Sequence, residues 1–86
     1  MKRREKWQVI WLPGAYVLIN METFDPKLMK ALRETKGVEE AYALYGVYDA
    51  IAITKADTME KLKETHDNIR KLNGIRQTLT MISHED

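Results

Sequence analysis

Hydrophobic residues recur along this chain with two periods, which predict strands and helices in turn. From residue 15 to residue 22 the apolar positions alternate as in a strand, and most residues between them are apolar too. A strand that is apolar on both faces is expected in the middle of a sheet, with each face covered. One row of this strand is Ala15, Val17, Ile19 and Met21, and the other is Tyr16, Leu18 and Asn20.

Two helices with recognisable ends separate the strands. Asp25 and Pro26 supply an N-cap and a first helical residue, and Gly37 suits a left-handed C-cap. Asp57 and Glu60 have the spacing of a capping box in which Asp57 is the cap. The helices are expected between residues 25 and 37 and between 57 and 74, and the strands over 15–22, 38–45, 48–54 and 75–83.

The predicted order β-α-β-β-α-β folds as a four-stranded antiparallel sheet with both helices on one face. In that topology the first and third strands are central. The third strand has bulky Ile51 and Ile53 on one face and small Ala50 and Ala52 on the other. The face away from the helices therefore carries residues such as Leu18 or the Ala50/Ala52 row, according to register. An apolar sheet face predicts an interface, so we expect two copies to pair sheet against sheet.

Composition narrows the class of protein. The 86 residues form one domain, and the absence of cysteine excludes disulfides and thiolate zinc sites. The net charge is +1, of which residues 1–6 contribute +3, so the rest carries −2 and is poorly equipped to grip phosphates. No apolar run approaches the roughly 20 residues of a membrane span, and we expect a cytoplasmic protein. Residues 1–14 are interpreted as a basic tail and an arm with the apolar stretch Trp7–Leu12, and residues 15–86 as the domain.

The densest cluster of useful chemistry lies in the connection between the second and third strands, which we predict to be a very tight turn. Gly46 can take a positive φ and expose backbone N–H groups. Asp49 offers a carboxylate for an ammonium group, and Tyr45 and Tyr48 offer flat walls with hydroxyl tips. Together they suit a small zwitterion. A plain hairpin, in which Gly46 makes the turn and Asp49 caps local N–H groups, is the alternative.

Few other residues offer binding or catalytic chemistry. Thr78 and Thr80 share a face of the last strand and could bind a carboxylate, although the β-propensity of threonine also explains them. His66 and His84 lie far apart and have no carboxylate at metal-motif spacing, and Ser83 stands alone. Without paired acid and base groups we expect no catalytic residue, no metal and no cofactor.

Two stretches resemble a known family. Residues 38–51, VEEAYALYGVYDAI, are similar to the central signature of the C-terminal effector domain of the Lrp/AsnC family, also called the RAM domain. In that signature a V-x-x-A-Y strand precedes G-x-Y-D and an apolar strand. Residues 73–82, NGIRQTLTMI, resemble the family's final G-V-x-x-T-x-T strand. The resemblance extends over about residues 15–83.

The resemblance implies a ferredoxin-like α/β fold, pairing through the sheets, and assembly of dimers into rings, commonly octamers or decamers. It also implies that amino acids or related effectors bind between dimers, near the G-x-Y-D loop and the last strand. Asp49 and loop backbone groups would then fix the ammonium and carboxylate groups, assisted by the threonines. The ligand contacts that it implies are Tyr45, Gly46, Tyr48, Asp49, Thr78 and Thr80.

Family transcription factors also carry an N-terminal helix-turn-helix domain, which the residues before Ala15 are too few to form. We therefore expect a stand-alone effector module that modulates transcription, alone or with full-length relatives, without binding DNA itself. The alternatives are a small ferredoxin-like enzyme and a ligand-free interaction module. A sheet-type nucleic-acid binder would need exposed aromatic residues beside basic ones, whereas the open face is expected to be aliphatic apart from Tyr16.

Overall fold

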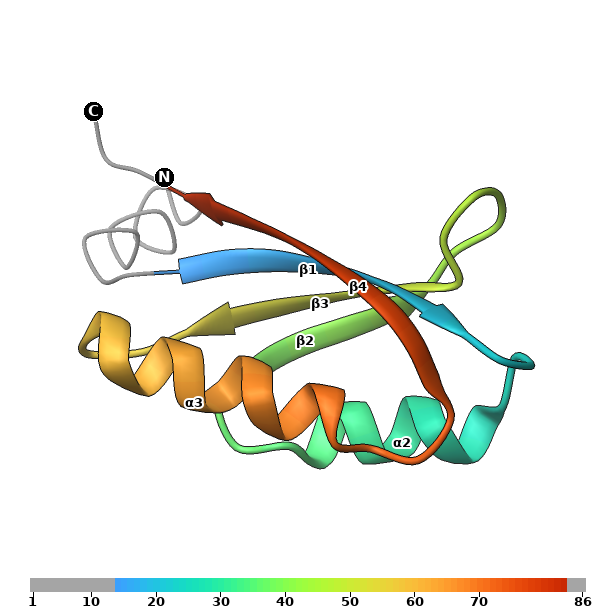
Figure 1. The fold of residues 1–86 in the computed structure, drawn as a ribbon, viewed down its shortest axis with the longest axis horizontal. Helices are drawn as coiled ribbons and strands as arrows, with labels where there is room; N and C mark the ends of the chain where they lie inside the picture. Colours follow the sequence, from blue (N-terminus) through green and yellow to red (C-terminus); the bar gives the residue numbers. More distant parts are fainter. Residues whose placement is uncertain (1–13, 84–86) are drawn as a thin grey trace, which may run out of the picture.

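The computed structural model describes residues 14–83 and has the predicted element order. The arm predicted at residues 7–12 lies outside the described residues. Figure 1 shows the sheet as one layer and the helices as a second layer beneath it. The elements in chain order are β1 (Gly14–Met21), α2 (Pro26–Glu34), β2 (Val38–Ala43), β3 (Ala50–Lys55), α3 (Met59–Arg70) and β4 (Ile75–Ser83).

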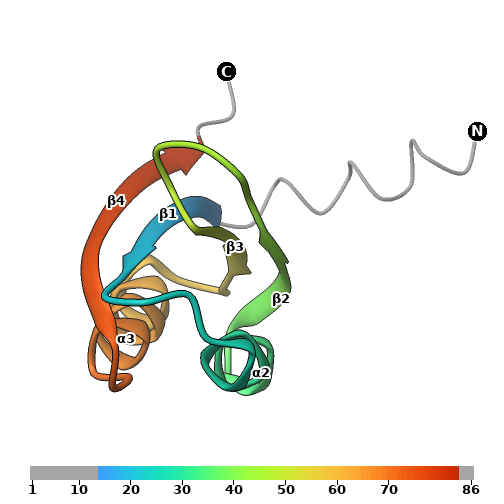
Figure 2. The same ribbon diagram turned by 90° about the vertical axis from the view of Figure 1, so that its right-hand side faces the viewer.

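The four strands form an antiparallel sheet in the order β2-β3-β1-β4, so β1 and β3 are central as predicted. Figure 2 shows that the sheet is curved and that α2 and α3 both lie on its concave side. The other side of the sheet is not covered by any described element. The ferredoxin-like βαββαβ fold expected from the sequence is thus confirmed.

The core lies between the sheet and the helices. Its buried residues show which side chains of each strand face the helices. The first row of β1 is buried, as are Ala50 and Ala52 of β3. Small alanine side chains leave space on the sheet for the bulky buried residues of the helices, among them Leu32 and Ile69. The suggestion that the Ala50/Ala52 row lies on the open face is therefore wrong, and Ile51 and Ile53 lie there with Leu18.

The helix caps follow the prediction at one helix and depart from it at the other. Asp25 caps α2, and its Oδ1 accepts a hydrogen bond from Lys27 N at 2.9 Å. At α3 the cap is Thr58 rather than Asp57, since Thr58 Oγ1 accepts from Lys61 N at 3.1 Å. Thr58 holds the extended backbone conformation directly before the first helical residue, so its hydroxyl has the correct position. Asp57 instead lies 3.9 Å from Lys61 Nζ.

His66 on α3 is a titratable residue that lies next to the core. Its Nε2 lies 3.5 Å from Oγ1 of the buried Thr54, which also donates to Ala15 O at 3.2 Å. Burial lowers the pKa of His66 below 6.5, an effect that Asp67 opposes and Arg70 reinforces. Between the folded and unfolded pKa values, the unfolded chain binds more protons. The contribution of His66 to stability is therefore complete above about pH 6.5 and decreases as the pH falls.

Replacing His66 by glutamine should flatten this dependence, because glutamine does not titrate. We expect urea unfolding of the native chain to show a free energy that decreases on acidification below about pH 6.5, and that of His66→Gln to decrease less. The two pH profiles, measured under the same salt conditions, provide the comparison. Parallel profiles would show that His66 does not contribute to the pH dependence.

Candidate functional site

The connection between β2 and β3 is a projecting loop rather than the predicted tight turn. β2 ends at Ala43 and β3 begins at Ala50, which leaves residues 44–49 outside the ladder. A hydrogen bond from Leu44 N to Asp49 O, 2.9 Å long, closes the loop at its base. The loop rises above the sheet on the side away from the helices (Figure 1). The apolar residues 44–48 suggest continued strands, but no neighbouring strand remains there to pair with them.

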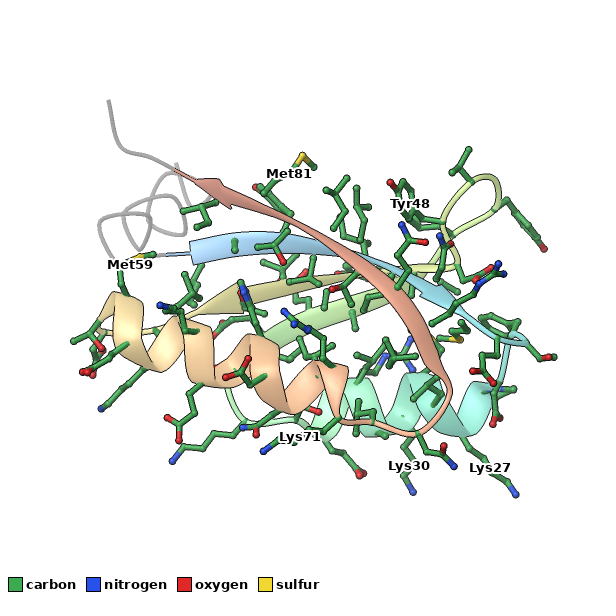
Figure 3. The ribbon with its side chains drawn as sticks, in the orientation of Figure 1. Lys27, Lys30, Tyr48, Met59, Lys71 and Met81 are labelled. Atoms are coloured by element: carbon green, nitrogen blue, oxygen red, sulfur yellow. The ribbon has the colours of Figure 1, made fainter. Side chains whose placement is uncertain are left out.

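The tip of this loop is open to solvent. The exposed fraction is 105% for Tyr45 and 81% for Val47, and no atom lies within 4 Å of a Cβ placed on Gly46. Gly46 has a φ of +122°, in agreement with the positive φ proposed for it. Tyr48 is half-buried and projects on the side of the sheet away from the helices, as Met81 does (Figure 3). The tip therefore presents an aromatic side chain and unprotected backbone to a partner or a ligand.

Asp49, the last residue of the loop, is hydrogen-bonded to β1. Its backbone N–H donates to Ile19 O at 2.8 Å, and its carboxylate Oδ2 accepts from Met21 N at 2.8 Å. The residue is half-buried. The structure thus gives Asp49 a backbone-binding role, as in the hairpin alternative, although the bonded N–H group is 28 residues away rather than local.

Thr78 and Thr80 do not lie beside Tyr48. In the β1–β4 ladder Thr78 is opposite the buried Ile19, which places both threonines on the helix side of the sheet. Thr78 is half-buried and Thr80 is exposed, since β4 is an edge strand. The loop joins the sheet on the other flank of β1, and Tyr48 projects on the opposite side. Within one chain the six predicted site residues therefore do not form a single pocket.

The uncovered sheet face is apolar and contains an aromatic residue that the sequence analysis missed. Tyr42 is 51% exposed and lies opposite Ile51, on the same face as Tyr16. Tyr42 lies two residues after Glu40 on the same strand, so strand alternation places both side chains on one face. This spacing next to a charged residue could have indicated that Tyr42 is exposed. The remaining apolar residues of this face are Leu18, Ile51, Ile53, Leu79 and Met81.

The group with the largest effect on Tyr42 is acidic. The Tyr42 hydroxyl donates to Glu40 Oε1, and this hydrogen bond and the negative charge of Glu40 raise the pKa of Tyr42 above 10.0, an effect that the positive charge of Arg33 opposes. Sheets that stack nucleobases need exposed aromatic residues beside positive charges. Glu40 next to Tyr42 is therefore unfavourable for nucleic acid on this part of the sheet.

Residues 14–83 contain no candidate metal-binding group. No set of three or more His, Asp or Glu in this part of the chain could hold a metal ion. His66 faces Thr54 in the helix–sheet layer rather than the loop. Among the same residues, no helix is long and apolar enough to cross a membrane.

Fold and loop together define a small α/β domain with an uncovered sheet face and an exposed loop. Residues 15–86 match the Lrp/AsnC ligand binding domain, and the chain belongs to the Lrp/AsnC family. The HTH-type transcriptional regulator LysM of Sulfurisphaera tokodaii is 29% identical over 66 residues, which are 77% of this chain and 47% of LysM. The chain thus spans about half the length of this relative.

Solved structures agree with this assignment. The crystal structure of FFRP-DM1 has a TM-score of 0.77 and 32% identity, and the match covers 85% of this chain and 100% of that one. A feast or famine regulatory protein from M. tuberculosis, complexed with L-methionine, has a TM-score of 0.73 and 19% identity; the match covers 94% of this chain and 56% of that one. The family is one of transcriptional regulators, so the domain is a regulatory, effector-binding one.

Proposed function

We propose that this domain senses an amino acid or a related small molecule and modulates transcription through its own assembly, without contacting DNA itself. The observation that carries the proposal is the exposed tip formed by Tyr45 and Gly46. It presents backbone groups and an aromatic wall, which suit a small zwitterion. The M. tuberculosis relative in complex with L-methionine supports this class of ligand.

The site is completed between copies of the chain. Tyr45, Gly46 and Tyr48, with Asp49 at the base of their loop, belong to one flank of the sheet. Thr78 and Thr80 belong to the helix side of the far edge, and the loop tip and these threonines are the two groups of ligand contacts. A ligand that contacts both groups must lie where the loop of one copy meets β4 of another. In this arrangement loop backbone groups and threonine hydroxyls bind the ammonium and carboxylate groups, and Tyr48 provides an apolar wall.

Assembly starts at the uncovered sheet face. Tyr16, Tyr42, Leu79 and Met81 are each at least 40% exposed there, and a second copy would cover them. Dimers formed in this way would join into a ring of eight or ten copies, as the family resemblance implies. Full-length Lrp/AsnC regulators are a second class of partner, through which a domain without DNA contacts of its own acts on transcription in the cytoplasm.

The proposal is tested by titrating the purified chain with the standard amino acids one at a time in a calorimeter, with light scattering on the same samples. We expect at least one to bind without being consumed, and a species of dimer size or larger. Tyr48→Ala and Thr78→Ala should each weaken that binding about tenfold. The first variant removes the apolar contact with the ligand, and the second removes roughly one hydrogen bond. Full assembly with no binding would indicate a ligand-free interaction module, and turnover of an amino acid would indicate an enzyme.

A further inference from the structure

Asp49 is the only residue through which the loop 44–49 is hydrogen-bonded to the sheet in the described part of the chain. Three bonds meet there: from Asp49 N to Ile19 O, from Leu44 N to Asp49 O, and from Met21 N to Asp49 Oδ2. Among residues 14–83, Tyr45 to Tyr48 make no hydrogen bond to the rest of the domain. Asp49 is therefore the residue that ties the loop to β1.

The pattern of these bonds shows what the carboxylate replaces. The β1–β3 ladder ends at the pair Ile19–Ala50, so Asp49 is the next residue, opposite Asn20. In a regular continuation of this ladder Met21 would pair with Tyr48, and Met21 N–H would donate to the backbone carbonyl of Tyr48. Here the N–H of Asp49 donates to Ile19 O, one residue out of that register, and the carbonyl of Asp49 accepts from Leu44 on the β2 side and closes the loop.

The side chain of Asp49 then takes the place of the Tyr48 carbonyl. Met21 is 4% exposed, and a buried backbone N–H without an acceptor is destabilising. Asp49 Oδ2 satisfies it at 2.8 Å. One residue with two acceptors thus continues the sheet and closes the loop at the same time, which a residue with a backbone carbonyl alone cannot do.

We propose that Asp49 is the positioning residue of the effector loop: its carboxylate replaces a backbone carbonyl in the sheet and does not bind the ammonium group of the ligand. This role requires an acceptor oxygen and no negative charge, whereas an ammonium contact would require the charge. The part of the proposal that concerns ligand affinity rests on the proposed function, while the part that concerns loop geometry does not.

The test compares Asp49→Asn, which keeps an acceptor oxygen, with Asp49→Ala, which keeps none. Asp57→Ala is the matched control, because it removes an exposed carboxylate that follows the opposite end of β3 from the loop and lies near Lys61. Amide hydrogen exchange is followed by NMR at Met21 and Leu44, and the standard amino acids are titrated by calorimetry. We expect Asp49→Asn and Asp57→Ala to keep both exchange protection and affinity within about threefold of the native chain, and Asp49→Ala to lose about tenfold or more in each.

Other outcomes have separate meanings. If Asp49→Asn lost as much affinity as Asp49→Ala while Met21 stayed protected, the charge of Asp49 would be meeting the ligand and the proposal would be overturned. Unchanged Met21 protection in Asp49→Ala would overturn it as well. If the native chain bound no amino acid, the proposed function would fail, and Met21 exchange alone would decide the role of Asp49. Should Asp49→Ala not fold, a native-like exchange pattern in Asp49→Asn would support the proposal and a loss of Met21 protection there would overturn it.

Discussion

Replacing Gly37 by alanine should destabilise the domain by about 2–4 kcal/mol, a large part of the stability of a small domain. Gly37 has a φ of +97°, where an L-residue costs about 1–2 kcal/mol. A Cβ at this position would also lie 2.1 Å from Oγ1 of the buried Thr65. The Thr65 hydroxyl donates to Lys61 O at 3.2 Å, so it cannot move away without losing that bond. Urea unfolding measures the loss.

Gly46→Ala provides the matched control for this prediction. Gly46 also has a positive φ, of +122°, but a Cβ there would meet no atom within 4 Å. This variant should therefore show only the backbone cost of about 1–2 kcal/mol. The difference between the two variants isolates the close approach of the α2–β2 turn to α3. Equal losses in both would show that Thr65 adjusts at little cost, contrary to this prediction.

Under the proposed sheet pairing, replacing Leu79 by lysine should convert the dimer into monomers, with the dimer dissociation constant raised at least about a hundredfold. Leu79 is 45% exposed and lies opposite Leu18 on the uncovered sheet face. In a monomer a lysine there keeps its ammonium group in water, so the fold should be retained. Between two sheets the charge would be buried without a partner, and a symmetric dimer would bury two. Light scattering over a concentration series gives the measurement.

Met59→Lys is the control for the assembly prediction. Met59 is equally exposed, at 45%, but it lies on α3 in the other layer (Figure 3). The same chemical change there should leave the oligomer size unaltered. Dissociation by Met59→Lys but not by Leu79→Lys would place the interface on the helix side and contradict sheet pairing.

The loop 44–49 shows which features of the candidate site could be predicted from the sequence and which could not. The positive φ of Gly46 was predictable, because the residue type itself permits it. The length of the loop was not, since Leu44 and Tyr45 continue the apolar pattern of β2 and nothing local marks the end of pairing. The hydrogen bond of Asp49 to Met21 joins residues far apart in the chain, so no short-range pattern could indicate it.

The sequence by itself determined the order of the elements, the two-faced apolar strands β1 and β3, the cap at Asp25 and the family. These features follow from periodicity and residue type within short stretches of sequence, and they do not depend on contacts between distant segments. Only the tertiary structure decided that Ala50 and Ala52 face the helices, that Thr78 and Tyr48 project on opposite sides, and that Asp49 completes the sheet. Those outcomes depend on register and on the volumes that pack between layers, which arise only when strands distant in sequence pair.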